Sequence, residues 1–259
     1  MRDLFLALMF YTRIPTPAIK DFQPEDANKT LRCYSLVGAI VGIIYWAAFA
    51  VGDLVFNTPM AIVLAFGAGA LATGCFHEDG FADMVDGFGG GTDKQRILDI
   101  MKDSRIGTYG TIATILMYAM KFLALLTILT SSVIDRWWLA ALIFVCYHSL
   151  ARMTAGSMVF FSRYSRDDGT SKVKPVEKAW TWREMLGLYS FGMIPFVICI
   201  ALCPWCALTV APLVLLFTFF KLFYEKKIDG YTGDCLGALE QMCELVILLS
   251  FVVILKFAF

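Results

Sequence analysis

Seven long apolar segments restrict what this chain can fold into. Each holds about 16 to 24 mainly apolar residues, enough for a helix that crosses the hydrocarbon core of a bilayer. They run from Cys33 to Phe56, Pro59 to Phe76, Tyr109 to Thr130, Trp137 to Phe160, Met185 to Cys203, Trp205 to Phe220 and Leu239 to Phe259. Hydrophobic residues make up 59% of the chain and charged residues only 17%, which argues against an ordinary soluble enzyme. We expect an all-α, polytopic transmembrane bundle of about seven helices, with six or eight spans as alternatives.

Basic residues fall mostly on one side of the expected membrane. With connections that alternate between the two sides, 18 of the 22 lysine and arginine residues lie in four of them: Met1 to Arg32, His77 to Gly107, Phe161 to Glu184 and Lys221 to Asp234. The positive-inside rule places these connections in the cytoplasm, so we expect the functional motif loops on that face. The 22 acidic residues balance the 22 basic ones, which gives no electrostatic reason to expect nucleic acid as a partner.

No internal repeat or linker divides the sequence, and we interpret residues 1–259 as a single integral-membrane domain surrounded by lipid. The apolar stretch from Met1 to Tyr11 is too short to span and is expected to lie along the membrane surface. Cys203-Pro204-Trp205-Cys206 has the spacing of a redox or metal motif, but it lacks a second ligand pair. We interpret it as a structural turn. The sequence leaves the oligomeric state open, with a homo-oligomer as one option.

The densest polar motif, at residues 77–87, directly follows the second apolar segment. Asp79, Asp83 and Asp86 are spaced i, i+4 and i+7, which places their carboxylates along one face of a helix. Three like charges in a row repel one another, and a bound cation would offset this cost. Carboxylate oxygens without thiolates suit Mg²⁺ or Mn²⁺ better than structural zinc. We predict a metal site at these aspartates, with a solvated acidic face as the structural alternative.

Residues around this motif could complete a phosphate site. His77 could act as a base or as an orienting group, although a lone histidine more often only forms hydrogen bonds, and Glu78 stands beside it. The glycine-rich stretch 87–92 predicts a phosphate loop or, equally, a hinge. Residues 94–102 predict an amphipathic helix that leads into the segment Lys102-Asp103-Ser104-Arg105. In this segment Arg105 could bind a phosphate in a bidentate manner or anchor the membrane interface.

Ionisable residues also occur inside the apolar segments, where they are costly and indicate function. Lys121 and Arg152 lie within spans, and Arg152 could contact a phosphate whereas Lys121 could snorkel or pair with an acid. Asp234 and Glu244 precede and open the last span, and they could add acids to a metal site. His148 lies in an apolar stretch and is assigned to packing.

These motifs resemble those of the cobalamin synthase family, the adenosylcobinamide-GDP ribazoletransferases. The resemblance rests on three ordered stretches, at residues 77–87, 100–110 and 232–238 with Glu244, and it covers almost the whole chain. The segment Thr12-Arg13-Ile14-Pro15 and Arg152 also fall where that family has similar residues. The chain departs from the family pattern at Cys235, where threonine is usual, and at Gln241, where an acid is usual, with Glu240 beside it.

The resemblance implies an enzyme of the inner membrane that acts late in vitamin B12 assembly. It would join adenosylcobinamide-GDP to α-ribazole or α-ribazole 5′-phosphate, with Mg²⁺, and release GMP. The predicted catalytic residues are Asp79, which the resemblance implies to be essential, with His77 and Asp83. The predicted metal ligands are Asp79, Asp83, Asp86 and Asp234. The predicted phosphate-binding residues are Lys102, Asp103, Ser104, Arg105 and Arg152, with supporting roles for Arg13, Glu78, Lys121 and Glu244.

Three other classes of membrane protein could use similar residues. A CDP-alcohol phosphotransferase would carry an Asp-Gly-x-x-Ala-Arg pattern, but Asp79-Gly80 is followed by Phe81-Ala82-Asp83. An intramembrane prenyltransferase would need two well-separated aspartate-rich motifs. A cation transporter would place its acids in mid-span rather than at one face. Release of GMP from a cobinamide-GDP substrate distinguishes the four classes.

Overall fold

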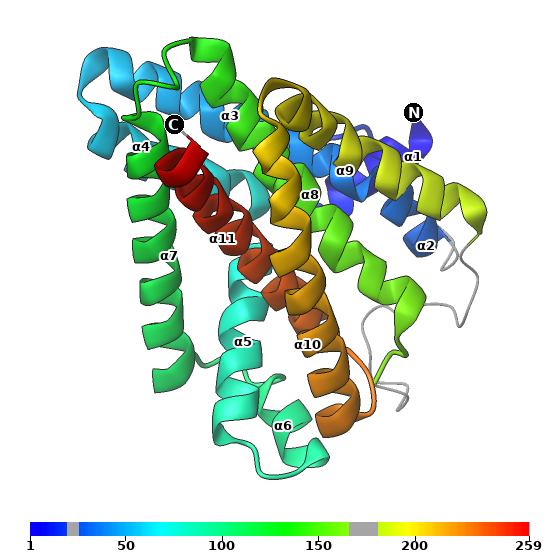
Figure 1. Ribbon diagram of the computed structural model, residues 1–259. Coiled ribbons are helices and arrows are strands. Elements are labelled where there is room, and N and C mark those ends of the chain that lie inside the picture. Colours follow the sequence, from blue (N-terminus) through cyan, green and yellow to red (C-terminus); the bar gives the residue numbers. More distant parts are fainter. Residues whose placement is uncertain (20–25, 166–180, 259) are drawn as a thin grey trace.

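The computed structural model describes residues 1–19, 26–165 and 181–258, and this part of the chain is almost entirely helical (Figure 1). The helices are α1 (Arg2–Tyr11), α2 (Asp26–Thr30), η1 (Leu31–Cys33), α3 (Tyr34–Val55), α4 (Thr58–Thr73), α5 (Phe76–Gly90), α6 (Lys94–Ile100), α7 (Thr108–Leu129), α8 (Trp137–Phe161), α9 (Trp182–Leu202), η2 (Pro204–Thr209), α10 (Val210–Ile228) and α11 (Gly233–Ala258). Within the described ranges, the only β contact is an isolated bridge between Tyr164 and Tyr231. The all-α prediction is confirmed.

The predicted number of spans also agrees with the structure. Among the described residues, six helices are long and apolar enough to cross a membrane, or seven if the bent pair α4 and α5 counts as one span. The sixth predicted span is longer than expected, because η2 and α10 together cover Pro204–Ile228. The last helix begins at Gly233, six residues before the predicted start at Leu239. Glu240 and Glu244, with which the predicted span opens, lie on this helix and are buried in the bundle.

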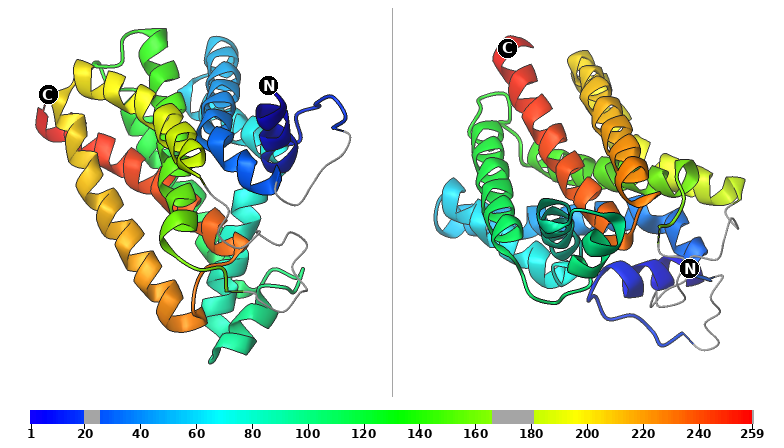
Figure 2. Two further views of the ribbon diagram at one scale, coloured as in Figure 1. Left: turned by 90° about the vertical axis from the view of Figure 1, so that its right-hand side faces the viewer. Right: turned by 90° about the horizontal axis from the view of Figure 1, so that it is seen from below.

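Helices α8 and α11 form the centre of the bundle. Helix α11 packs against α5, α7, α8 and α10, and its orange-to-red ribbon runs from the middle of the bundle to the edge in both views of Figure 2. Helices α7, α9 and α10 are mostly exposed and present apolar side chains outward, among them Leu116, Leu123, Leu215 and Leu222. A continuous apolar exterior of this kind matches the hydrocarbon of a bilayer.

Two glycines allow α3 and α8 to approach closely. A Cβ atom at Gly38 would lie 2.5 Å from the backbone oxygen of His148, and one at Gly42 would lie 2.6 Å from that of Phe144. Small residues four positions apart commonly mediate such contacts between membrane helices. The contact matters for function because it holds α8, with His148 and Arg152, against the rest of the bundle.

A sharp corner separates α4 from α5. Gly74 and Cys75 both adopt left-handed backbone conformations, with φ of 66° and 58°, and the two helices meet at 90°. The second predicted span therefore ends earlier than expected, at Thr73 rather than Phe76. Arg13 braces the corner: its backbone N–H donates to the Ala72 carbonyl at 2.7 Å, and its side chain occupies the space that a Cβ at Gly74 would need. The corner directs α5, with its acidic motif, away from the axis of α4.

Candidate active site

The acidic motif lies on helix α5, as its spacing predicts. Asp79 in the first turn of α5 is exposed, Asp83 is half-buried and Asp86 is buried. Their i, i+4, i+7 spacing places the three carboxylates along one face of the helix, which runs from the α4 corner toward α6. The glycines of the predicted phosphate loop continue α5 as far as Gly90, so that stretch is helical rather than a loop. Because Gly87 has no side chain, Met101 at the end of α6 packs directly against α5.

Asp86 links α5 to the start of α7. Its Oδ2 accepts a hydrogen bond from the backbone N–H of Gly107 at 2.6 Å, and its Oδ1 accepts one from that of Gly110 at 2.9 Å. Free N–H groups at a helix N-terminus carry partial positive charge, so this carboxylate stabilises the end of α7. A Cβ at Gly107 would lie 2.3 Å from Asp86 Oδ1, which explains why glycine stands there.

The fourth predicted metal ligand comes to α5 from the other end of the sequence. A Cβ at Gly80 would lie 3.1 Å from the Asp234 Cα atom, and one at Gly237 would lie 3.1 Å from the His77 carbonyl oxygen. The two glycines therefore allow the backbones of α5 and α11 to touch. Asp234 lies in the first turn of α11, next to the segment of α5 that carries Asp79 and Asp83.

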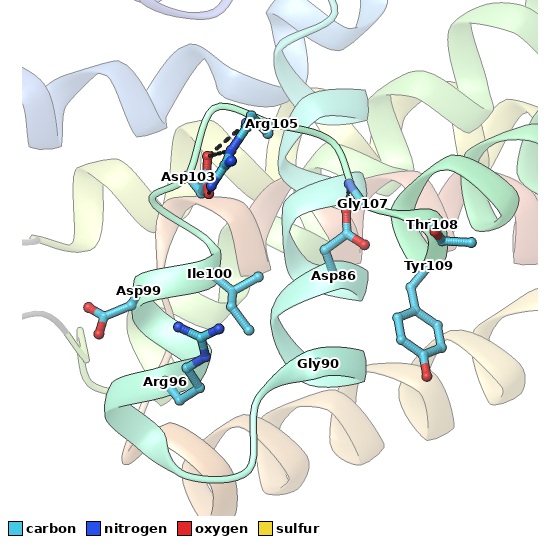
Figure 3. A pocket seen from close by; sticks show the side chains of 10 residues that line it. All are labelled: Asp86, Gly90, Arg96, Asp99, Ile100, Asp103, Arg105, Gly107, Thr108 and Tyr109. Atoms are coloured by element: carbon cyan, nitrogen blue, oxygen red, sulfur yellow. Dashed lines mark hydrogen bonds and ion pairs between the residues drawn. The ribbon is translucent and has the colours of Figure 1, made fainter.

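A cleft of about 380 Å³ opens where α5, α6 and the start of α7 meet (Figure 3). Its lining residues are Asp86, Gly90, Arg96, Asp99, Ile100, Asp103, Arg105, Gly107, Thr108 and Tyr109. Asp86 forms part of the wall, and the side chains of Arg96 and Arg105 come from opposite ends of α6 and its following turn (Figure 3). Lys102 and Ser104, both predicted to bind phosphate, are exposed near the cleft but do not line it.

Arg105 is paired with Asp103 across this turn. The two side chains form a bidentate contact, with Nη2 to Oδ2 at 2.6 Å and Nε to Oδ1 at 3.0 Å. The hydrogen bonds from Arg105 lower the pKa of Asp103 to about 2, so the carboxylate is ionised at neutral pH. A phosphate that binds Arg105 would therefore compete with Asp103 for the same guanidinium.

Behind α5, a network of charged side chains is buried between four helices. Lys121 of α7 lies 2.7 Å from Glu244 of α11 and donates to Gln241 at 2.6 Å. Arg152 of α8 lies 2.7 Å from Glu240, and His148 Nδ1 lies 2.5 Å from Glu244. Arg152, Glu240 and Glu244 are each at most 2% exposed. The network sets two carboxyl groups against one ammonium and one guanidinium group, and contact between opposite charges reduces the cost of charge in the bundle interior.

His77 joins this network to α5. It is 2% exposed, its Nε2 lies 2.8 Å from the Tyr34 hydroxyl, and its Nδ1 lies 3.4 Å from Arg152 Nη2. Its ring therefore points into the bundle, whereas Asp79 on the same helix is exposed. On the α7 side, the Tyr118 hydroxyl donates to Glu78 at 3.2 Å. These contacts hold α5 in one orientation.

Within the described ranges, one group of three potential metal ligands has its donor atoms within 4.8 Å of one another: His148, Glu240 and Glu244. Lys121 and Arg152 already neutralise these carboxylates, so this group is better described as an ion-pair network than as a metal site. The side chains of the four predicted aspartate ligands are more widely spaced, although they share one face of α5 and the adjoining turn of α11.

Sequence reasoning missed the roles of Arg96, Glu240 and His148. A signal for the network was present, because His148 and Arg152 are spaced i and i+4 on α8, as Glu240 and Glu244 are on α11. A basic pair on one helix and an acidic pair on another, each with this spacing, can face each other where the two helices pack together. Arg152 and Lys121, which the sequence placed in spans, are both within this network rather than on the cleft wall.

Comparison with known proteins gives a consistent result. The family model described as cobalamin-5-phosphate synthase matches residues 3–252. A protein of Shewanella amazonensis is 42% identical over 252 residues, which cover 95% of this chain and 94% of the relative. A relative from Shewanella frigidimarina is 39% identical, and the match covers 94% of this chain and 93% of the relative. A relative from Vibrio parahaemolyticus is 35% identical, and the match covers 97% of this chain and 92% of the relative. All three are named adenosylcobinamide-GDP ribazoletransferase. No solved structure matches the chain.

Proposed function

Because the chain belongs to the cobalamin-5-phosphate synthase family, we propose that the acidic face of α5 and the adjoining cleft are its transferase site. The chain is a transferase of vitamin B12 biosynthesis with adenosylcobinamide-GDP ribazoletransferase activity. Its substrates are adenosylcobinamide-GDP and a ribazole compound, either α-ribazole or α-ribazole 5′-phosphate. The observation that supports the proposal is the cleft where α5, α6 and the start of α7 meet, because acidic and arginine side chains lie together on its surface.

The reaction transfers a phosphoryl group between two oxygens. The ribose hydroxyl of the ribazole attacks the phosphorus next to cobinamide, a new phosphorus–oxygen bond forms, and the bond to GMP breaks. Such transfers depend mainly on positioning and on neutralising charge on the phosphate oxygens. An enzyme therefore needs groups that hold a diphosphate in line with the nucleophile, and it does not need a covalent intermediate on the protein.

The donor set on α5 fits Mg²⁺. Asp79 is exposed and Asp83 half-buried on the same helix face, and the Gly80 contact brings the backbone of Asp234 beside them. An all-oxygen site with accessible carboxylates suits a cation that keeps several waters and also binds substrate phosphates. We assign Asp79, Asp83 and Asp234 to hold it, with Asp86 mainly tying α7 to α5. When bound, Mg²⁺ supplies positive charge to the diphosphate and to the departing GMP.

The protein's own residues supply the remaining functions. Arg105 binds phosphate by exchanging its Asp103 partner for a phosphate oxygen pair, and Arg96 contributes a second cation to the same cleft. Asp79 is the exposed aspartate in the first turn of α5, and it accepts the proton of the attacking hydroxyl. His77 holds α5 from behind through Tyr34 and Arg152 and acts as a positioning residue.

The exterior of the bundle and the distribution of basic residues support a location in the inner membrane. We place the α5 and α6 end in the cytoplasm, because the connections on this side carry most of the lysine and arginine residues. Lipid surrounds the apolar faces of α7, α9 and α10. A homo-oligomer within the membrane is compatible with these exposed faces.

The proposal is tested by measuring GMP release from adenosylcobinamide-GDP in purified membranes. We expect Asp79→Asn to lower turnover by at least 10²-fold while the protein stays folded, because the residue combines metal and proton roles. The matched control is Asp135→Asn, which removes another exposed acid, on the α7–α8 connection. Full turnover by the Asp79→Asn variant would show that α5 is not the reaction site.

A further inference from the structure

The Cys203-Pro204-Trp205-Cys206 turn lies at the end of the bundle opposite the cleft (Figure 1). It connects α9 to η2, and α10 then runs from η2 to the α6 end, where Asp229 pairs with Lys94 at 3.0 Å. The 19 residues of α10 correspond to a length of about 28 Å. The turn is therefore separated from the acidic face by roughly the thickness of a membrane core, and the transferase site makes no use of it.

The backbone of this turn brings its two cysteines together. The N–H of Cys206 donates to the carbonyl of Cys203 at 2.9 Å, which closes an i to i+3 turn. In such a turn the Cα atoms of residues i and i+3 lie within about 7 Å of each other, and here Cys203 caps η2 while Cys206 lies in its first turn. Disulfides usually join Cα atoms about 4.4 to 6.8 Å apart.

The two cysteines differ in accessibility. Cys203 is half-buried, whereas Cys206 is 9% exposed and packs into the core. An accessible thiol followed by a shielded one is the arrangement in which the first reacts with an external disulfide and the second resolves it. Cys146 of α8 and Cys199 of α9 are both buried, so their thiols are shielded from an external protein.

We propose that Cys203 and Cys206 form a dithiol–disulfide couple at the outer face of the membrane. The oxidant is the disulfide of a thiol-oxidising protein in that compartment. The thiolate of Cys203 attacks one sulfur of that disulfide, forms a mixed disulfide and releases the other sulfur as a thiol. The thiolate of Cys206 then attacks the Cys203 sulfur and releases the second thiol of the oxidant. Two protein thiols are oxidised, one partner disulfide is reduced, and the two thiol protons pass to the partner.

The choice of compartment follows from the placement of charge. The cleft end carries most of the basic residues and is assigned to the cytoplasm, so the turn faces the opposite, oxidising side. The closed disulfide would fasten the turn between α9 and α10. The candidate span that follows the turn, Pro204–Ile228, is the least buried of the candidate spans in the described chain.

The test uses the full chain extracted from bacterial cells in the presence of a thiol-blocking reagent. Chymotrypsin cleaves after Trp205, between the two cysteines, so a disulfide keeps two peptides linked and free thiols release them. We expect linked peptides that separate on reduction, and we expect their loss in Cys203→Ser but not in the control Cys33→Ser. Blocked thiols at both positions, or a Cys146–Cys199 link in their place, would overturn the proposal.

A second measurement does not depend on any variant. After mild reduction of intact cells, a maleimide that cannot cross the membrane is expected to label Cys203. Labelling of Cys203 only after the cells are permeabilised would place the turn in the cytoplasm and overturn the proposal. Transferase activity of the Cys203→Ser variant is expected to equal that of the wild type, whereas reduction is expected to lower the melting temperature of the wild type alone.

Discussion

Lys121 offers a quantitative test of the buried network. Its ammonium group lies between Glu244 at 2.7 Å and Gln241 at 2.6 Å, and the side chains of Lys121 and Glu244 are only 5% and 3% exposed. Lys121→Met keeps the length and the apolar stem of the side chain but removes the charge. Glu244 is then left with its contacts to His148 at 2.5 Å and Arg152 at 3.4 Å.

The expected cost follows from this geometry. Removal of one partner from a buried ion pair destabilises a protein by about 3 to 5 kcal/mol, because the other charge stays buried without compensation. Since Glu244 keeps two cationic or protonatable neighbours, we expect the lower end, about 3 kcal/mol. For a chain of this size, that corresponds to a melting temperature lower by roughly 6 to 12 °C.

The assay is thermal unfolding in detergent, accompanied by measurement of GMP release. The matched control is Lys256→Met near the end of α11, which removes a lysine outside the network and is expected to change the melting temperature little. The double variant Lys121→Met with Glu244→Gln removes both charges and should recover part of the loss. Equal melting temperatures for Lys121→Met, the control and the wild type would refute the view that the network stabilises the bundle.

Three further predictions concern the site itself. Gly80→Ala places a methyl group within 3.1 Å of the Asp234 Cα atom, so we expect α11 to move away from α5 and kcat to fall about tenfold. The control Gly67→Ala, whose methyl group meets no atom within 4 Å, should leave kcat unchanged. Equal kcat values for the two variants would contradict the role of the contact. Because the pKa of Asp103 is lowered from 3.8 to about 2, the ion pair between Asp103 and Arg105 is intact above about pH 4 and weakens as the pH falls toward 2. The dependence of kcat on pH between pH 6 and 8 should therefore show no titration of this pair. Asp103→Asn should lower KM for adenosylcobinamide-GDP about two- to fivefold, because substrate no longer displaces a carboxylate from Arg105, and a higher KM would contradict this competition.

The helices and the acidic face could be predicted from the sequence because both depend on local periodicity. Apolar runs of sufficient length identified α3, α7, α8 and α9 to within a few residues. The i, i+4, i+7 spacing of Asp79, Asp83 and Asp86 placed the three carboxylates on one face of a helix, where the structure has them. Neither inference required knowledge of which helices are neighbours.

The parts that could not be predicted depend on contacts between distant segments. The corner at Gly74 and Cys75 interrupts an apolar run that looked continuous, because a left-handed cysteine has no clear sequence signal. The last span was predicted to begin at Leu239, and the sequence left open whether Glu240 lies near a membrane interface or faces other helices. In the bundle its charge is paired with Arg152, 88 positions earlier in the chain, so the helix tolerates it.

The central claim is that Asp79 and Asp83 of α5, together with Asp234, hold a divalent cation against a diphosphate. Electron paramagnetic resonance of Mn²⁺ added to the purified protein with GDP measures this binding without requiring turnover. The account predicts that Asp79→Asn and Asp83→Asn each weaken Mn²⁺ binding by at least about tenfold, whereas Asp135→Asn has no effect. Wild-type affinity in both α5 variants would contradict it.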